Sequence, residues 1–461
     1  MASSWSMYKW LLLLAACGDN ATVTVTPDAA PPDPVLAQLR GLPNVADANE
    51  VATANQGYRY IVVHFRQPVD HHDPASGTFL QEVSLLHKDT TSPLIVHTSG
   101  YSDYYLDTVV ELTALLGANQ ISIEHRYFGT SRPLVPDWSK LTIEQMADDE
   151  HAIVTALRTI YTGKAISTGG SKGGMTAVFY RRFFPDDVDG TVPYVAPISF
   201  STLDERYPPH IATLGPQACH DAIRAVAVEM IQHRRAALEA ATMAQALQKN
   251  YSYTRVSLPV VVEGAIEGLE WTFWQYYGVD YCSTVPALDA TDDDMFMFLD
   301  MISPPSDSDD AQIDFFEAYY YQSYAQLGYP DDGTTYLAPY YQYTSSDWLG
   351  AFPGGVEPAF DSGAAMRDID AFVQQNGDRL LFVYGQWDPW TGGAFQLGGA
   401  SDSLELVQPM GTHNSHIGRL AAADKSAALA KLEAWTGVTP KTMVRIAPDP
   451  RVRPVRALRG R

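Results

Sequence analysis

The alternation of hydrophobic and polar positions predicts short strands in the first half of the chain. From Tyr58 onward, apolar runs of strand length follow one another and are separated by turn residues. These runs read YRYIVVHF, FLQEVSLLH, SPLIVHTSG and, last, residues 121–124. The segment GKAISTGGSKGGMTAVFYRRFF then reads as a strand, a tight turn at glycines and a helix that begins at Lys172. Strands that alternate with helices favour a mostly parallel sheet with helices on both faces.

A helical stretch interrupts this pattern. Between residues 200 and 370, apolar residues recur at helical spacing in segments such as RAVAVEMIQHRRAALEAATMAQALQ, MFMFLDMI and FFEAYYYQSYAQL. The strand pattern returns with RLLFVYG, and KSAALAKLEAWTG reads as a closing amphipathic helix that ends at a glycine. We therefore expect an α/β core, residues 46–199 and 371–438, with a mainly helical cap, residues 200–370, inserted in it.

The two ends of the chain differ from the middle. Residues 1–17 combine a lysine, a short apolar run and small residues before Cys17, which is typical of a signal peptide. The apolar run is far shorter than the ~20 residues of a membrane-spanning helix. Because LAAC at residues 14–17 resembles the bacterial lipobox, we expect an exported protein held at the cell envelope only by a lipid on Cys17. The alternative is ordinary secretion, with Cys17 removed in the signal peptide. Residues 18–45 are expected to be a linker, and residues 439–461 a basic tail with no assigned role.

Charge and cysteine content narrow the picture further. The 54 acidic and 31 basic residues give a formal net charge of −23, which repels nucleic acid and anionic membranes, so a nucleic-acid function is excluded. Once Cys17 is set aside, Cys219 and Cys282 remain, and an even pair can bridge in an oxidising compartment. We expect this disulfide; the alternative is two buried free thiols.

One motif carries chemistry. Residues 169–173 read Gly-Gly-Ser-Lys-Gly and fit G-x-S-x-G between a predicted strand and a predicted helix, which exposes the Ser171 hydroxyl as a nucleophile. A serine needs a base that an acid orients, and on α/β-hydrolases these follow the serine as acid and then histidine. Asp388 directly follows the strand RLLFVYG, and beyond it only His413 and His416 remain as bases.

The oxyanion that this chemistry creates needs hydrogen-bond donors. We expect the backbone amide of Lys172 to supply one, and the loop with Gly100 and Tyr101 to supply the other; ordinary core packing is the alternative for Tyr101. The neighbours His71, His72 and Asp73 resemble metal ligands, but adjacent residues of a strand point in opposite directions and no partner cluster is evident. We expect no metal, and the proposed chemistry requires no cofactor.

Several motifs in order resemble one peptidase family. They are FRQPVDHHDPASGTF, SGY, EHRYFGTSRP, TGGSKGGMT and WDPWTGG, and together they span roughly residues 58–437. The chain is similar to the S37 family, typified by the PS-10 peptidase, of prolyl tri- and tetrapeptidyl aminopeptidases, and more distantly to the S28 prolyl carboxypeptidase and dipeptidyl-peptidase family. The S37 resemblance implies an α/β-hydrolase fold and peptide substrates cut near a free N-terminus, with proline before the scissile bond. Alignment of PMGTHNSHIGRL with the related pattern favours His413, whereas the more distant family's S-H-L pattern selects His416.

Candidates for substrate recognition lie in or near the cap. An aminopeptidase needs an anion for the substrate ammonium, and Glu124, Glu267 and Glu270 are the candidates. Aromatic residues of the cap, Trp274 among them, could flank a proline ring, although packing within the cap is the alternative. A carboxylesterase or lipase would use the same triad. An inactive, lipid-anchored binding protein would have lost part of the triad, and here all its residue types are present.

Overall fold

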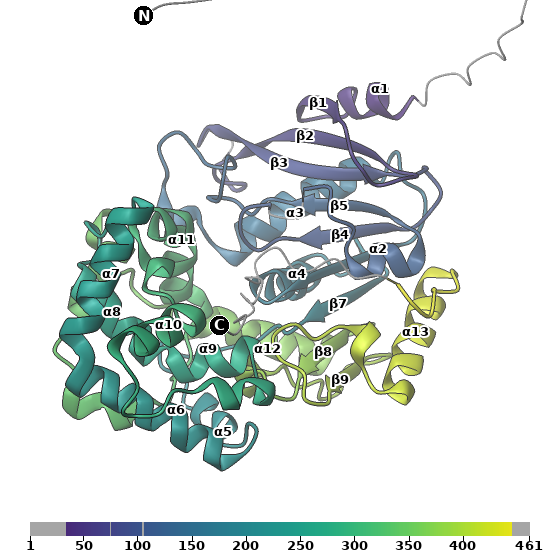
Figure 1. The fold of residues 1–461 in the computed structure, drawn as a ribbon. Helices are drawn as coiled ribbons and strands as arrows, with labels where there is room; N and C mark the ends of the chain where they lie inside the picture. The colour runs from purple at the N-terminus through teal and green to yellow at the C-terminus, as the bar shows by residue number, and fades with distance from the viewer. Residues whose placement is uncertain (1–33, 74, 104–105, 445–461) are drawn as a thin grey trace, which may run out of the picture. The chain divides into compact units, whose positions relative to one another are not determined.

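A computed structural model describes residues 34–73, 75–103 and 106–444 (Figure 1). Cys17 and nearly all of the predicted tail lie outside these residues, so the lipidation prediction has no structural counterpart here. In the described ranges, none of the helices combines the length and the apolar character that a membrane crossing requires.

A nine-stranded mixed sheet forms the centre of the described chain, in the order β1-β2-β3-β5-β4-β6-β7-β8-β9 (Figure 1). The strands are β1 (Val45–Val51), β2 (Arg59–Pro68), β3 (Thr78–His87), β4 (Leu94–Thr98), β5 (Asn119–Ile123), β6 (Ala165–Gly170), β7 (Gly190–Tyr194), β8 (Leu381–Gly385) and β9 (Leu404–Gln408). The first three strands and β5 pair antiparallel, and the pairs from β5 through β4 to β9 are parallel. After β4 the chain adds β5 on one side and later β6 on the other. Sheets of this kind bind ligands at such a reversal, outside the carboxyl ends of the strands.

The central strands are buried because helices cover both faces of the sheet. Leu94 and Val96 of β4 join one apolar cluster, while Ile95 between them joins another. The first cluster includes residues of α1 (Val35–Arg40), α3 (Ile143–Leu157), α4 (Lys172–Phe183) and α12 (Ala364–Asn376), and the second includes residues of α2 (Glu111–Leu116) and α13 (Ala422–Thr436). With the strand-turn-helix at Ser171, this architecture confirms the predicted α/β-hydrolase fold.

The cap is helical and has an apolar core of its own. Its helices are α5 (Tyr207–Ile211), α6 (Gln217–Glu229), α7 (Arg235–Lys249), α8 (Leu258–Glu267), α9 (Leu269–Tyr276), α10 (Asp292–Ile302) and α11 (Asp310–Gln322). Short π-helical segments, Met230–Arg234 and Ser323–Leu327, follow α6 and α11. A disulfide joins Cys219 of α6 to Cys282 in the 3-10 segment Val279–Thr284, so both ends of the predicted bridge lie in the cap.

Two predicted boundaries were wrong. The boundary between residues 370 and 371 falls inside α12, whose Met366 and Val373 pack in the core cluster together with α4. The predicted linker also extends too far, because α1 begins at Val35 and buries Val35 and Leu39 completely. Both segments carry apolar positions that face the sheet, and they therefore belong to the core.

Candidate active site

Ser171 occupies a sharp turn between β6 and α4. Its φ of 55° and ψ of −127° lie in a region that non-glycine residues rarely adopt, and such strain typically costs ~1–3 kcal/mol. The neighbouring glycines allow the turn. A Cβ at Gly169 would lie 2.4 Å from the Gly173 carbonyl carbon, and a Cβ at Gly173 would lie 2.3 Å from the Thr98 carbonyl oxygen. A serine whose strained backbone is held by such close packing is typical of a nucleophile that projects from the edge of the sheet.

Asp388 and His413 form a buried hydrogen-bonded pair at the end of β8. Asp388 Oδ2 lies 2.7 Å from His413 Nδ1, and Asp388 Oδ1 accepts a hydrogen bond from the Trp390 amide at 3.1 Å. The Asp388 side chain is fully buried, and that of His413 is 7% exposed. The cap contributes too, because the His413 amide donates to the Gln275 carbonyl of α9 at 2.9 Å. The Trp390 amide thus holds one oxygen of the Asp388 carboxylate in place, and the other oxygen orients the His413 imidazole.

The other nitrogen of His413, Nε2, is buried and has no hydrogen-bond partner among the described residues. Buried polar atoms are rarely left unsatisfied, so an orphan of this kind calls for an explanation. Ser171 follows β6, and β6, β7 and β8 are neighbours in register, with Gly170 opposite Tyr194 and Tyr194 opposite Val383. Serine and histidine therefore lie at the same edge of the sheet. No hydrogen bond joins them within the described ranges, and such bonds often tighten only when substrate binds.

His416, the second candidate base, points elsewhere. Its amide donates to Gln408 Oε1 at 3.3 Å, and its ring lies 6.0 Å from the Tyr194 ring, centroid to centroid. Of the two histidines, the structure brings His413 to Asp388.

The two predicted oxyanion donors lie side by side. Lys172 opens α4, where the helix dipole favours negative charge. The loop after β4 rests on the same turn, since a Cβ at Gly100 would lie 2.4 Å from the Gly173 nitrogen. The ring of Tyr101 packs edge-on against Phe128, with 5.7 Å between centroids, and also contacts α11 of the cap. For Tyr101, packing of the ring and a backbone role are therefore compatible.

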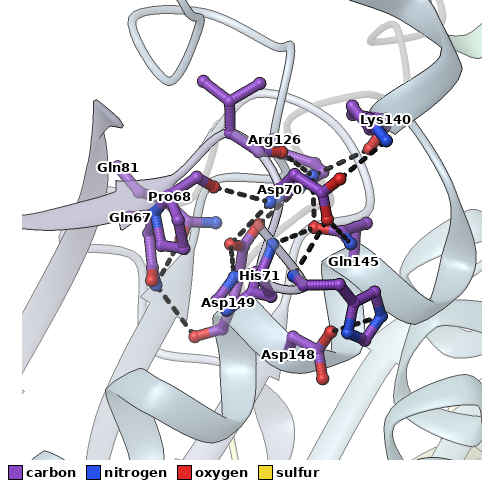
Figure 2. A network of polar contacts seen from close by, with 12 residues as sticks. Gln67, Pro68, Asp70, His71, Gln81, Arg126, Lys140, Gln145, Asp148 and Asp149 are labelled. Carbon is purple, nitrogen blue, oxygen red and sulfur yellow. Dashed lines mark hydrogen bonds and ion pairs between the residues drawn. The ribbon is translucent and has the colours of Figure 1, made fainter. Parts of the chain in front are cut away.

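His71 belongs to a structural network (Figure 2). Its Nε2 lies 2.7 Å from Asp149 Oδ1, and Arg126 donates to both oxygens of the same carboxylate at 2.7 and 2.9 Å. Arg126 also donates to the carbonyls of Pro68 and Val69, so the network ties the turn after β2 to α3. Among the residues that the structure describes, no group of three or more potential ligands could hold a metal ion.

The surroundings of Glu124, Glu270 and Trp274 contradict the substrate-binding role predicted for them. The Glu124 carboxylate accepts hydrogen bonds from the amides of Asp103, Thr130 and Ser131, and it therefore shapes a buried loop. Glu270 is 2% exposed and is bound to the Arg224 guanidinium and to His220. Trp274 is fully buried in the cap core. All three side chains are buried, and both carboxylates already have partners, so none of them is open to a substrate.

Glu267 is the remaining carboxylate candidate. It lines a cap cavity of about 600 Å³, together with Glu263, Asp332 and several tyrosines. Burial, and secondarily the charge of Asp332, raises the pKa of Glu267 to about 7. Its carboxylate accepts hydrogen bonds from the hydroxyls of Tyr341 and Thr334, and no lysine or arginine pairs with it in the described part of the chain.

Sequence reasoning missed two supports of the site. Glu111 of α2 is buried, and its carboxylate accepts hydrogen bonds from the amides of Ile417 and Gly418, which anchors the loop that carries His413. His210 of the cap bonds the Asp388 carbonyl through Nε2 at 3.0 Å. Neither residue lies in a recognisable motif, and only the three-dimensional arrangement reveals them.

Comparisons with known proteins show which proteins the chain resembles. The sequence profile of the family described as PS-10 peptidase S37 matches residues 35–461. The chain is 36% identical over 439 residues to the prolyl tri/tetrapeptidyl aminopeptidase of Streptomyces mobaraensis, covering 94% of this chain and 91% of that one. It is 30% identical over 164 residues to the lysosomal Pro-X carboxypeptidase of Mus musculus, covering 30% of this chain and 33% of the other. Among solved structures, the proline iminopeptidase of Mycobacterium smegmatis has 16% identity and a TM-score of 0.37, with coverage of 80% of this chain and 99% of that one.

Proposed function

The chain belongs to the PS-10 peptidase S37 family of serine peptidases, and on this premise we propose that it releases tri- or tetrapeptides from free N-termini, cutting after proline. The similarity to a prolyl tri/tetrapeptidyl aminopeptidase over 94% of the chain supports this substrate class. The observation that carries the mechanism is the buried Asp388–His413 pair, whose second imidazole nitrogen is unpartnered within the described structure, at the sheet edge that bears the strained Ser171.

The proposed reaction is acyl transfer to water. Ser171 Oγ attacks the peptide carbonyl while His413 Nε2 takes its proton, and Asp388 keeps the other imidazole proton on Nδ1. The amides of Lys172 and Tyr101 bind the oxyanion. His413 then passes the proton to the leaving amine, and water, activated by the same imidazole, releases the N-terminal peptide and restores the serine.

Recognition of the N-terminus requires an acceptor for the substrate ammonium. We assign this role to Glu267, because it combines a cavity, partial burial and the absence of a lysine or arginine partner in the described chain. An ammonium nearby would favour the ionised carboxylate and so lower its pKa from the value near 7.

The decisive experiment is a panel of fluorogenic peptides with free or blocked N-termini and with proline or alanine before the scissile bond. We expect the wild type to cleave free, proline-containing tri- and tetrapeptides, and Ser171→Ala to lose this activity. If blocked peptides were cut equally well, the aminopeptidase assignment would be wrong. Turnover of short esters without any peptide cleavage would favour the esterase alternative.

We also propose that the chain is exported and that Cys17 is acylated, on the basis of the lipobox-like segment at residues 14–17. Expression in a bacterial host should place the protein in the membrane fraction, and Cys17→Ser should release it from that fraction. Mass spectrometry of the mature N-terminus distinguishes a lipid-modified cysteine from ordinary cleavage.

A further inference from the structure

The side chain of Lys172 is buried directly beside the nucleophile. Lys172 is 2% exposed, and its Nζ donates a hydrogen bond to the Gly100 carbonyl at 2.5 Å. The nitrogen lies 5.4 Å from the centre of the Tyr101 ring and 5.1 Å from that of Phe128. Glu150 of α3 is also buried, and its carboxyl interacts electrostatically with the Lys172 amine. Burying a lysine this deeply opposes folding unless the group is paired, so its retention beside the catalytic turn needs a reason.

The hydrogen bond from Lys172 does not depend on its charge. Burial lowers the pKa of the Lys172 amine well below its ordinary value, and burial raises the pKa of Glu150. Both shifts favour the neutral pair. A neutral amine still has N–H groups, so it continues to donate to the Gly100 carbonyl.

The Gly100 carbonyl belongs to the same peptide group as the Tyr101 amide. In a planar trans peptide, the C=O and the N–H point in opposite directions. By holding the carbonyl toward the interior, Lys172 turns the Tyr101 N–H away from it. The next peptide is held as well, because the Tyr101 carbonyl accepts hydrogen bonds from the His125 amide at 2.9 Å and from Ser99 Oγ at 2.7 Å. Both peptide groups that flank Tyr101 are therefore fixed.

We propose that the Lys172 side chain is a positioning residue that orients the Tyr101 amide toward the oxyanion formed at Ser171. This inference rests on the mechanism proposed above. It gives Lys172 two roles, since its own amide binds the oxyanion and its side chain fixes the second donor. Preorganised donors of this kind are effective because they need no rearrangement when charge develops.

The test replaces the amine without leaving a lone buried acid. In Glu150→Gln/Lys172→Met the donor to Gly100 is lost and the acid is neutralised; Glu150→Gln alone keeps the donor and is the matched control. If this double variant does not fold, Glu150→Leu/Lys172→Met replaces both polar groups with apolar ones, an exchange that is often tolerated even where the buried groups are an ion pair. Circular dichroism and thermal melting establish that each variant is folded.

Two rates are measured for each protein: hydrolysis of a proline-containing peptide, and covalent labelling of Ser171 by a fluorophosphonate. We expect the double variant to lose about 10- to 100-fold in kcat with KM within about twofold, because loss of a whole oxyanion donor costs ~10²–10³ in kcat. Labelling should slow in parallel, and Glu150→Gln should stay near wild type.

Three results would overturn the inference: a folded double variant with wild-type kcat, a rise in KM at constant kcat, or an equal loss in Glu150→Gln. Labelling separates this failure from failure of the proposed function. A wild type that is labelled at Ser171 but cleaves no proline peptide refutes the substrate class. If the double variant is also labelled as fast as the wild type, the positioning role of Lys172 is refuted as well.

Discussion

Replacing Asp388 with asparagine tests the catalytic pair most directly. The substitution keeps the size and planarity of the side chain, so the surroundings decide how it lies. In the native protein one carboxylate oxygen accepts the Trp390 amide and the other faces His413 Nδ1. The Trp390 amide is a donor, so the asparagine oxygen stays beside it. The NH2 group is thereby turned toward His413.

That orientation changes which nitrogen of the imidazole carries the proton. An NH2 group donates to Nδ1, so the ring proton moves to Nε2, which can then no longer accept the proton of Ser171. In serine proteases such a tautomer error lowers kcat by ~10⁴, equivalent to ~5 kcal/mol. If the substitution only weakened one charged hydrogen bond, worth ~1.5–3 kcal/mol, kcat would fall by only about 10- to 150-fold. The size of the loss therefore distinguishes the two explanations.

The assay is steady-state hydrolysis of a proline-containing peptide by wild type and Asp388→Asn. Asp402→Asn serves as the matched control, because Asp402 is exposed and pairs with Lys431 away from the site. We expect the control to keep wild-type kcat. A folded Asp388→Asn variant that loses less than about tenfold would refute the role assigned to the pair.

Three further predictions follow from the same structure. His413→Ala should abolish peptide hydrolysis as Ser171→Ala does, whereas His416→Ala should keep kcat within about tenfold, because its ring lies against Tyr194; parallel kcat measurements check this. Replacing Cys219 and Cys282 with serine should destabilise the cap by at most ~4 kcal/mol, because the bridge closes a loop with a sequence separation of 63. Denaturant unfolding of this variant measures the loss of stability. A loss below ~1 kcal/mol would contradict the entropic reasoning. Burial raises the pKa of Asp103 from 3.8 to about 6. Between these two pH values the native state therefore holds a proton that the unfolded chain has released. The free energy of unfolding should fall as the pH rises from about 4 to 6. Asp103→Asn should flatten that slope in unfolding curves recorded across the range, and an unchanged slope would show that other groups cause it.

Much of the core could be predicted because its physical cause is local. Strands β4, β6 and β8 are covered on both faces, so most of their residues are apolar or small, and such runs stand out in the sequence. The turn at Ser171 was equally visible, because its glycines satisfy a local steric demand. β1 escaped detection. Its segment VADANEV buries only Ala48, since it is an edge strand with one partner, and no apolar pattern marks it.

The details of the site depend on which way side chains face, and this is a property of the folded chain. His413 and His416 lie in one short loop with similar neighbours, and only the position of Asp388 separates them. Glu270 and Trp274 have suitable chemistry for a substrate pocket, but α9 turns both toward the interior of the cap. Residue type indicates what a group can do, and packing decides whether a ligand can reach it.

The insertion of the cap has a consequence for biosynthesis. Strand β7 ends at Tyr194 and its partner β8 begins at Leu381, so the ribosome must produce the whole cap before the sheet can acquire its last two strands. Until then β7 is an unprotected edge with free backbone donors and acceptors, open to pairing with another nascent chain. Contacts between distant segments also form slowly. We therefore expect the unfolded chain to depend on chaperones until β8 and β9 have paired, wherever that folding takes place, and aggregation of chains truncated within the cap would reveal that dependence.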